Sequence, residues 1–121
     1  MTIENLKSQI KNGLIVSCQA PANSPLAKPE IIAAFAATAD QNGAVGLRID
    51  SPENIRMVRA ITKLPIIGIF KIVAPPSEVY ITPTFESAKQ VAEAGADIIA
   101  IDATLRVRPD GEKLSEIVQR I

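Results

Sequence analysis

The stretch Leu64-Pro65-Ile66-Ile67-Gly68-Ile69-Phe70-Lys71 decides the fold. After Pro65 it holds an unbroken run of apolar residues and glycine, which is typical of a strand buried on both faces in a parallel sheet between helices. Lys71 then falls at the carboxyl end of that strand, the end where ligands bind in folds built on parallel strands. This lysine also has a second interpretation, since a long side chain can simply extend from a strand end into water.

The composition predicts one small domain with an aliphatic core. The chain has 121 residues, and we expect residues 1–121 to form a single domain. Hydrophobic residues make up 47% of it but aromatic residues only 3%, as is common where helices cover a parallel sheet. Lys and Arg number 13 and so do Asp and Glu, and no basic block indicates nucleic-acid binding.

Three absences limit the function. No run approaches the roughly 20 apolar residues that a membrane span needs. Cys18 is the only cysteine, so no internal disulfide can form, and we expect a soluble protein in the reducing cytoplasm. The chain has no histidine, which excludes Ser-His-Asp and Cys-His nucleophiles and histidine zinc sites within it. Acid-base chemistry would therefore use Lys, Asp, Glu, Tyr or Cys.

Strand and helix patterns alternate along the chain. Further strands are expected at residues 14–18, 44–48 and 98–101. Helices are expected at residues 3–11, 29–41 and 85–94, and two more helices are expected, one that Ser51 caps and a last one that reaches residue 121. The expected buried helix positions are Ile31, Ile32, Phe35, Ala39, Ile55, Val58, Ile61, Val91, Leu114, Ile117, Val118 and Ile121. A long loop, residues 72–84, follows Lys71, and loops of that length are often functional. The pattern predicts an α/β fold of four parallel βα units with a short N-terminal helix.

Four polar residues follow the predicted strands, namely Gln19, Arg48, Lys71 and Asp102. Because carboxyl ends of parallel strands meet at one edge, we expect these side chains to converge there. A lysine beside a cation and partly buried would have a lowered pKa, and its neutral amine could act as a base or form a Schiff base. Asp102 would either bind a substrate hydroxyl or pair with Lys71. Such a pair would raise the pKa of the lysine instead of lowering it.

The other polar residues each have a plain alternative. Arg48 is as well suited to an ion pair with Asp50 or Asp102 as to a ligand, and Gln19 could cap a loop. Cys18 is expected to be a small core residue. Arg106 and Arg108 could bind an anionic substrate, although a solvated loop explains them equally.

Several ordered motifs resemble those of the N-acetylmannosamine-6-phosphate 2-epimerase family, over essentially the whole chain. They are Val16-Ser17-Cys18-Gln19-Ala20, Gly46-Leu47-Arg48, the stretch ending at Lys71, Val79-Tyr80-Ile81-Thr82-Pro83-Thr84, and Ala94-Gly95-Ala96-Asp97-Ile98-Ile99-Ala100-Ile101-Asp102-Ala103-Thr104 with Arg106 and Arg108-Pro109. In place of the Arg-Asp pair that usually follows the lysine in that family, this chain has Ile72-Val73.

The resemblance implies a fold and an activity. That family is a TIM barrel that interconverts N-acetylmannosamine 6-phosphate and N-acetylglucosamine 6-phosphate in sialic acid catabolism, with no metal or organic cofactor. It implies that Lys71 exchanges the C2 proton of the sugar, and that Gln19, Arg48 and Asp102 contact the sugar or its N-acetyl group. We expect Arg106 to bind the substrate as well. Since such a barrel needs about 250 residues, the chain is expected to be the N-terminal half, with the phosphate loops and a partner glutamate in the other half.

Two other hypotheses stay open. The chain could be a non-catalytic half-barrel that binds a sugar or a partner chain, or a Schiff-base lysine enzyme such as an aldolase. We also expect it to be a homo-oligomer or to bind a missing C-terminal half, because the inward faces of Ile15, Ile67, Ile69 and Ile98 would lack an opposite wall. As a half-barrel alone, it is expected to be inactive, without epimerisation at an enzymatic rate.

Overall fold

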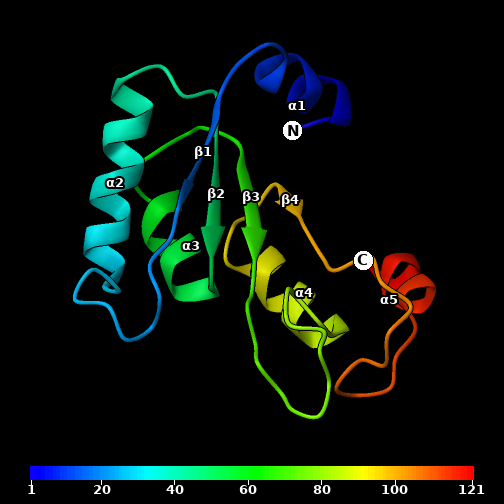
Figure 1. Ribbon diagram of the computed structural model, residues 1–121. Coiled ribbons are helices and arrows are strands. Elements are labelled where there is room, and N and C mark those ends of the chain that lie inside the picture. The colour runs from blue at the N-terminus through cyan, green and yellow to red at the C-terminus, as the bar shows by residue number, and fades with distance from the viewer.

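The computed structural model describes residues 1–121 and shows one parallel sheet with strand order β1-β2-β3-β4 (Figure 1). The strands are β1 (Ile15–Cys18), β2 (Gly46–Asp50), β3 (Ile66–Ile69) and β4 (Ile98–Ile99). The helices are α1 (Ile3–Ile10), α2 (Pro29–Gln41), α3 (Pro52–Arg59), α4 (Phe85–Glu93) and α5 (Leu114–Arg120). Four βα units in sequence order confirm the predicted α/β fold. No helix has the length and hydropathy required to cross a bilayer.

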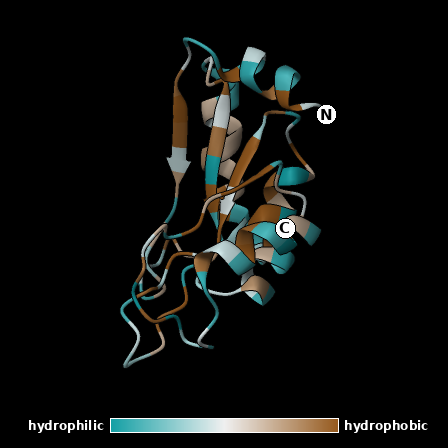
Figure 2. Ribbon diagram, turned by 90° about the vertical axis from the view of Figure 1, so that its right-hand side faces the viewer, coloured by the Kyte–Doolittle hydropathy of each residue, from teal (hydrophilic) through white to brown (hydrophobic).

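One face of the sheet packs against α2, α3 and α4. Leu47 and Ile49 of β2 and Ile66 of β3 are fully buried there, and Figure 2 shows the strands coloured mainly as hydrophobic. Their helix partners are Ile32, Ala33, Ala36, Ile55, Val58 and Val91. Each of the buried Val, Leu and Ile side chains contributes about 1.5–3 kcal/mol when it is removed from water, so this face supplies most of the core.

Gly68 lets α4 approach that face closely. A Cβ atom at this position would lie 2.5 Å from Val91 Cγ1 and 2.7 Å from Ala96 Cβ. Real Cβ contacts are longer than this, so only glycine fits without moving the helix or the strand. The glycine inside the stretch that ends at Lys71 is therefore a packing requirement of β3.

The helix faces differ in part from the prediction. Ile32, Ile55, Val58, Val91 and Ile117 are fully buried as expected. Phe35 and Ile61 are 41% and 47% exposed, and Val118 and Ile121 are exposed as well, so these four assignments were wrong. In α2 the core contact is made by Ile32 with the small residues Ala33 and Ala36, which turns Phe35 outward.

The ends of two strands also differ from the prediction. β2 runs on to Asp50, so Arg48 lies within the strand instead of at its end, and β4 is only Ile98–Ile99. Ser51 was predicted to cap α3 with its side chain, but it has a φ of 81° and makes no such bond. Proline at the first position of α3 has no N–H that needs an acceptor. A separate bond, from Asn54 Nδ2 to the Asp50 carbonyl, ties the first turn of α3 to the end of β2.

We call the second face of the sheet, opposite the helices, the open face. It is defined by a row of residues that pair with one another across the four strands. Ser17, Arg48, Ile67 and Ile98 are paired across the four strands, and neighbours paired in parallel strands point to the same side. Ile67 and Ile98 are half-buried, as is Ile15. Ile69 is fully buried, contrary to the expectation that the whole face would be uncovered.

The long loop after Lys71 folds back beside the end of β3. The Ile72 N–H donates to the Tyr80 carbonyl at 2.8 Å, and the Thr82 N–H donates to the Phe70 carbonyl at 2.8 Å. Lys71 and Ile81 form an antiparallel bridge. The returning segment places backbone groups next to the residue that the sequence marks as functional.

Candidate active site

Lys71 is held at the carboxyl end of the sheet by groups at the ends of β1 and β2. Its Nζ donates to Gln19 Oε1 at 2.8 Å, one residue beyond β1. Gln19 Nε2 in turn donates to Ser17 Oγ at 2.7 Å, which fixes the orientation of the amide. The Lys71 backbone N–H donates to Asp50 Oδ1 at 2.9 Å. The structure therefore brings together the lysine and the glutamine that the sequence placed at one edge.

Asp50 is a part of the site that sequence reasoning considered only as an ion-pair partner for Arg48. It is the last residue of β2, and its carboxylate binds the backbone of Lys71 and leaves the ammonium group to Gln19. The alternation of side chains was a usable signal, because Asp50 lies two residues after Arg48 and so shares its face. Because the predicted strand ended at Arg48, Asp50 fell outside it and was not assigned to the site.

Arg48 lies on the open face in the middle of β2, paired in register with Ser17 and Ile67. Its side chain is half-buried, and it forms neither of the predicted alternatives, an ion pair with Asp50 or with Asp102. A guanidinium carries five N–H donors and no acceptor. Arg48 is therefore a half-buried cation with its donors available on the face where β1 and β3 place Gln19 and Lys71.

Asp102 does not pair with Lys71. Its Oδ2 accepts from the backbone N–H groups of Tyr80 at 3.2 Å and Ile81 at 3.0 Å, and its own N–H donates to the Ile81 carbonyl. The alternative in which this carboxylate neutralises the lysine is thus not realised. One carboxylate oxygen is used to hold the loop that returns from β3, and the other has no partner in the protein.

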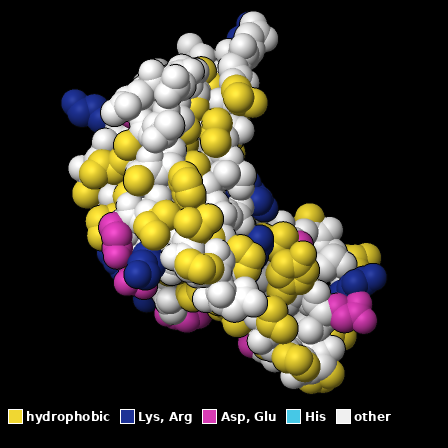
Figure 3. Space-filling model, turned by 60° about the vertical axis from the view of Figure 1, so that its left-hand side comes forward, with side chains coloured by type: hydrophobic (Ala, Val, Ile, Leu, Met, Phe, Trp, Pro, Cys, Tyr) yellow, Lys and Arg dark blue, Asp and Glu magenta, His cyan; other side chains and the backbone are white.

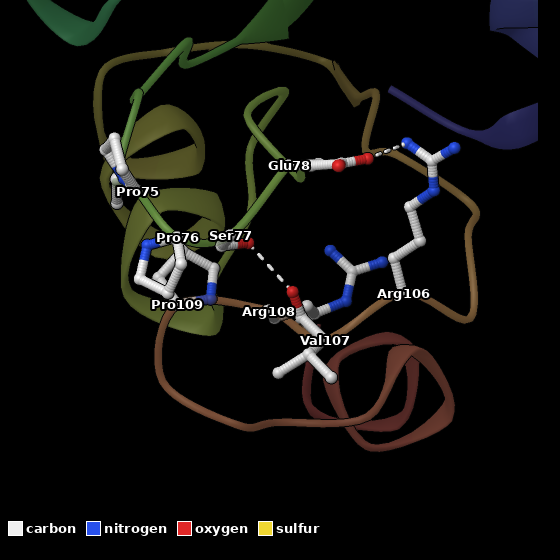
Figure 4. Close-up of a pocket in the computed structure, with 9 residues that line it drawn as sticks. Pro75, Pro76, Ser77, Glu78, Arg106, Val107, Arg108 and Pro109 are labelled. Atoms are coloured by element: carbon white, nitrogen blue, oxygen red, sulfur yellow. Dashed lines mark hydrogen bonds and ion pairs between the residues drawn. The ribbon is translucent and has the colours of Figure 1, made fainter.

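Arg106 lies apart from these residues. Its Nη1 forms a 2.6 Å ion pair with Glu78 Oε2, and the two side chains are 66% and 71% exposed. Figure 4 shows this pair at the rim of a cavity of about 520 Å³ between residues 74–78 and 106–109, which neither Lys71 nor Gln19 lines. The structure does not bring Arg106 to the lysine.

Arg108, the second arginine of that segment, is 2% exposed and is a structural residue. Its guanidinium donates to the Pro83 carbonyl at 3.2 Å and to the Asp102 carbonyl. Because these bonds are buried, Arg108 holds the chain after β4 against the loop after β3 and is not free to bind an anion.

Cys18 has the core position predicted for it. The side chain is 4% exposed and lies among the residues between β1 and the helices. Burial raises the pKa of the thiol, because the thiolate would lose its hydration. Although it adjoins Gln19 in sequence, it points to the opposite face of the sheet.

Four parallel βα units with polar groups at the carboxyl ends of the strands define half of a (β/α)₈ barrel with its site at the usual end. A structure of an N-acetylmannosamine-6-phosphate 2-epimerase from Clostridium perfringens matches the whole chain with a TM-score of 0.93 and 37% identity, over 53% of that chain. The half-barrel prediction is therefore confirmed.

Sequence comparisons give the same family. The protein-family model described as "Putative N-acetylmannosamine-6-phosphate epimerase" matches residues 32–121 of this chain. Proteins named "Putative N-acetylmannosamine-6-phosphate 2-epimerase" are 58% identical in Thermosynechococcus vestitus and 56% in Synechococcus elongatus, covering 97% and 93% of this chain. The chain spans about half the length of these relatives, 50% and 49%. The chain belongs to the N-acetylmannosamine-6-phosphate epimerase family, and none of these comparisons favours the binding-module hypothesis.

Proposed function

We propose that this chain supplies the lysine-bearing half of a site that interconverts N-acetylmannosamine 6-phosphate and N-acetylglucosamine 6-phosphate. Lys71 exchanges the proton at C2 of the sugar. The observation that carries the proposal is the contact between Lys71 Nζ and Gln19 Oε1, 2.8 Å long, at the carboxyl end of the sheet with no carboxylate on the ammonium group. A neutral amide orients the lysine tip without placing a negative charge beside it.

The reaction requires a base that can both take and return a proton at carbon. C2 carries a weakly acidic proton, and a base removes it efficiently only from a substrate held within hydrogen-bond reach. Lys71 provides the amine, and the Asp50 carboxylate holds the lysine backbone in place at 2.9 Å. The exposed lysine tip is accessible to a substrate above the strand ends.

The neighbouring residues bind the sugar in this proposal. Arg48 donates from its unpaired guanidinium to a carbonyl or hydroxyl oxygen of the substrate, and Gln19 contacts the N-acetyl group or the sugar while it orients Lys71. Asp102 accepts from a sugar hydroxyl with the oxygen that does not bind Tyr80 and Ile81. Arg106 lies apart from Lys71, so in this proposal it contacts an anionic part of the substrate only after its solvent-exposed pair with Glu78 opens, beside the phosphate loops of the second half.

A complete site in this proposal also needs the second half of the barrel. Lys71 is exposed on this chain, and water exclusion strengthens the electrostatic interactions on which proton transfer depends. Binding of the remote phosphate contributes to turnover as well as to affinity, because it holds C2 against the base. The partners proposed for the chain are therefore a sugar phosphate and a C-terminal half.

The experiment joins residues 1–121 in one polypeptide to the C-terminal half of the Thermosynechococcus vestitus relative. Deuterium incorporation at C2 of N-acetylmannosamine 6-phosphate is followed by NMR in deuterated water. We expect exchange that disappears in Lys71→Ala, because Lys71 is the one lysine of residues 1–121 that lies within two residues of the carboxyl end of a strand, whereas Cys18→Ala exchanges nearly as fast as the parent. Undiminished exchange in Lys71→Ala would show that another group is the base.

A further inference from the structure

Thr82 combines complete burial with an unusual backbone conformation. It is 0% exposed and has a φ of 45°, in the left-handed region that β-branched residues rarely adopt. A conformation of this kind persists only when surrounding bonds impose it, and it often occurs at functional sites. The bonds made by Thr82 therefore indicate what the strain serves.

Those bonds join the continuations of β3 and β4. Thr82 Oγ1 accepts from the Phe70 N–H at 3.0 Å and donates to the Ala100 carbonyl at 2.7 Å. The Thr82 N–H also donates to the Phe70 carbonyl at 2.8 Å. Phe70 directly precedes Lys71, and Ala100 comes two residues before Asp102. One buried side chain is thus bonded to both segments that lead into the site.

The two strands have separated at this level. Direct pairing between β3 and β4 ends at Gly68 and Ile99, and the last bond runs from the Ala100 N–H to the Gly68 carbonyl at 3.1 Å. Beyond it the segment from Tyr80 to Thr82 lies between them, bridged to Lys71 on one side and bonded to Asp102 on the other. The spacing of Lys71 and Asp102 is therefore set by this inserted segment.

We infer that Thr82 is a positioning residue for the reaction, which sets the place of Lys71 and its spacing from Asp102 through its hydroxyl. The inference rests on the proposed function of Lys71. Removal of the hydroxyl leaves the Phe70 N–H and the Ala100 carbonyl without their partner, and the buried groups must shift to find others. A shift of about 1 Å at a reacting group can reduce turnover by about 100-fold.

Thr62 offers a matched control at the opposite end of the sheet. It is also buried, and its Oγ1 donates to Asp40 Oδ2 at 2.6 Å and accepts from the Leu64 N–H at 3.1 Å. Thr62→Val and Thr82→Val each remove one buried hydroxyl with two bonds and keep a β-branched side chain. Both variants are expected to lower stability, but only Thr82→Val is expected to alter the site.

The test measures kcat for C2 exchange in the joined two-half protein, at a temperature where circular dichroism shows each variant folded. We expect Thr82→Val to lower kcat about tenfold or more, Thr62→Val to change it less than twofold, and Thr82→Ser, which keeps the hydroxyl, to restore most of it. If Thr82→Val does not fold, Thr82→Gly relieves the positive φ, lacks the hydroxyl, and is expected to show the same loss.

A second measurement uses the 121-residue chain alone. Thr82→Val should speed hydrogen exchange of the Lys71 amide, which is bonded to Asp50 and not to Thr82, about tenfold more than Thr62→Val does. Equal effects of the Thr82 and Thr62 variants on kcat, or no recovery in Thr82→Ser, would overturn the inference about Thr82. The proposed function would still stand in that case, provided that Lys71→Ala abolishes exchange of the C2 proton. Retained exchange in Lys71→Ala would instead refute the proposed function itself.

Discussion

The two ends of the sheet use charged residues in opposite ways. At the amino end Arg59 donates to Asp97 Oδ2 at 2.9 Å and to the Thr62 and Leu64 carbonyls, and Asp97 also accepts from the Ile66 N–H. At the carboxyl end Lys71 has one neutral partner for its ammonium group and Arg48 has none. Charged groups with several bonds inside the protein, such as Arg59, serve the fold, whereas charged groups with one internal bond or none, such as Lys71 and Arg48, are available to a ligand.

The largest effect on the rate of C2 proton exchange is expected when the second half of the barrel is absent. The 121-residue polypeptide alone should exchange the C2 proton about 1,000-fold more slowly than the joined two-half protein, because remote binding and water exclusion are both lost. NMR in deuterated water at equal protein concentration compares the two. Similar rates would mean that the residues of the open end need no second half, and that the half-site argument is wrong.

The next largest effect is a loss of stability when the charged cluster at the amino end of the sheet is broken. Arg59→Met keeps the length of the apolar stem but removes the guanidinium, which leaves Asp97 and two carbonyls short of partners. We expect the free energy of unfolding to fall by about 2–3 kcal/mol, less than for a fully buried pair because both side chains are partly exposed. Urea unfolding measures it. A loss below about 0.5 kcal/mol would place this cluster with ordinary surface pairs.

Association of the 121-residue polypeptide should follow from its uncovered surfaces. Leu14, Leu26 and Phe35 are exposed along a groove between β1 and α2, and Figure 3 shows many hydrophobic side chains on the face that it presents. Exposed apolar area and free strand edges favour contact between copies. Sedimentation velocity should show mass that rises with concentration, whereas a concentration-independent monomer would contradict the expectation. Phe35→Ser should weaken association, with the already exposed Leu105→Ser as the control.

The smallest effect is a pH dependence at Cys18. Burial raises its pKa above the ordinary value of 9.0, so the folded state favours the neutral thiol. The stability from this preference is fully present below about pH 9 and is lost as pH rises through the raised pKa. Between pH 8 and pH 10.5 the wild type should therefore lose slightly more stability than Cys18→Ala does. An equal loss in the two proteins would mean that the thiol is not desolvated in the folded chain.

The parts of the fold that could be predicted depend on local patterns. α2 has the predicted bounds, because Pro29 and Asn42-Gly43 mark its start and end in the sequence. The contact between Gln19 and Lys71 could be expected because both follow parallel strands. The predicted end of β2 at Arg48 was too early, although the alternation of polar and apolar residues continues past Arg48 to Asp50 and carried the signal for the longer strand.

The contacts of the loop after Lys71 could not be predicted at all. No periodicity encodes that Tyr80 and Ile81 bind the Asp102 carboxylate, or that Thr82 lies between the strand continuations. Each of these contacts joins one side chain to a backbone group about 20 positions away, and backbone groups are the same in every residue. The exposure of Lys71 is likewise a property of the tertiary structure, since the sequence of β3 alone predicts a buried strand end as readily.

The contrast between the two ends is tested most directly by one pair of arginine variants in the joined protein. For Arg48→Met and Arg59→Met, kcat/KM for C2 exchange is measured beside the free energy of unfolding. We expect Arg48→Met to lower kcat/KM about 100-fold and to change stability by less than about 0.5 kcal/mol. Arg59→Met should lose stability and keep kcat/KM within about threefold. The reverse result, with activity lost at Arg59 and stability lost at Arg48, would contradict the assignment of function to the carboxyl end.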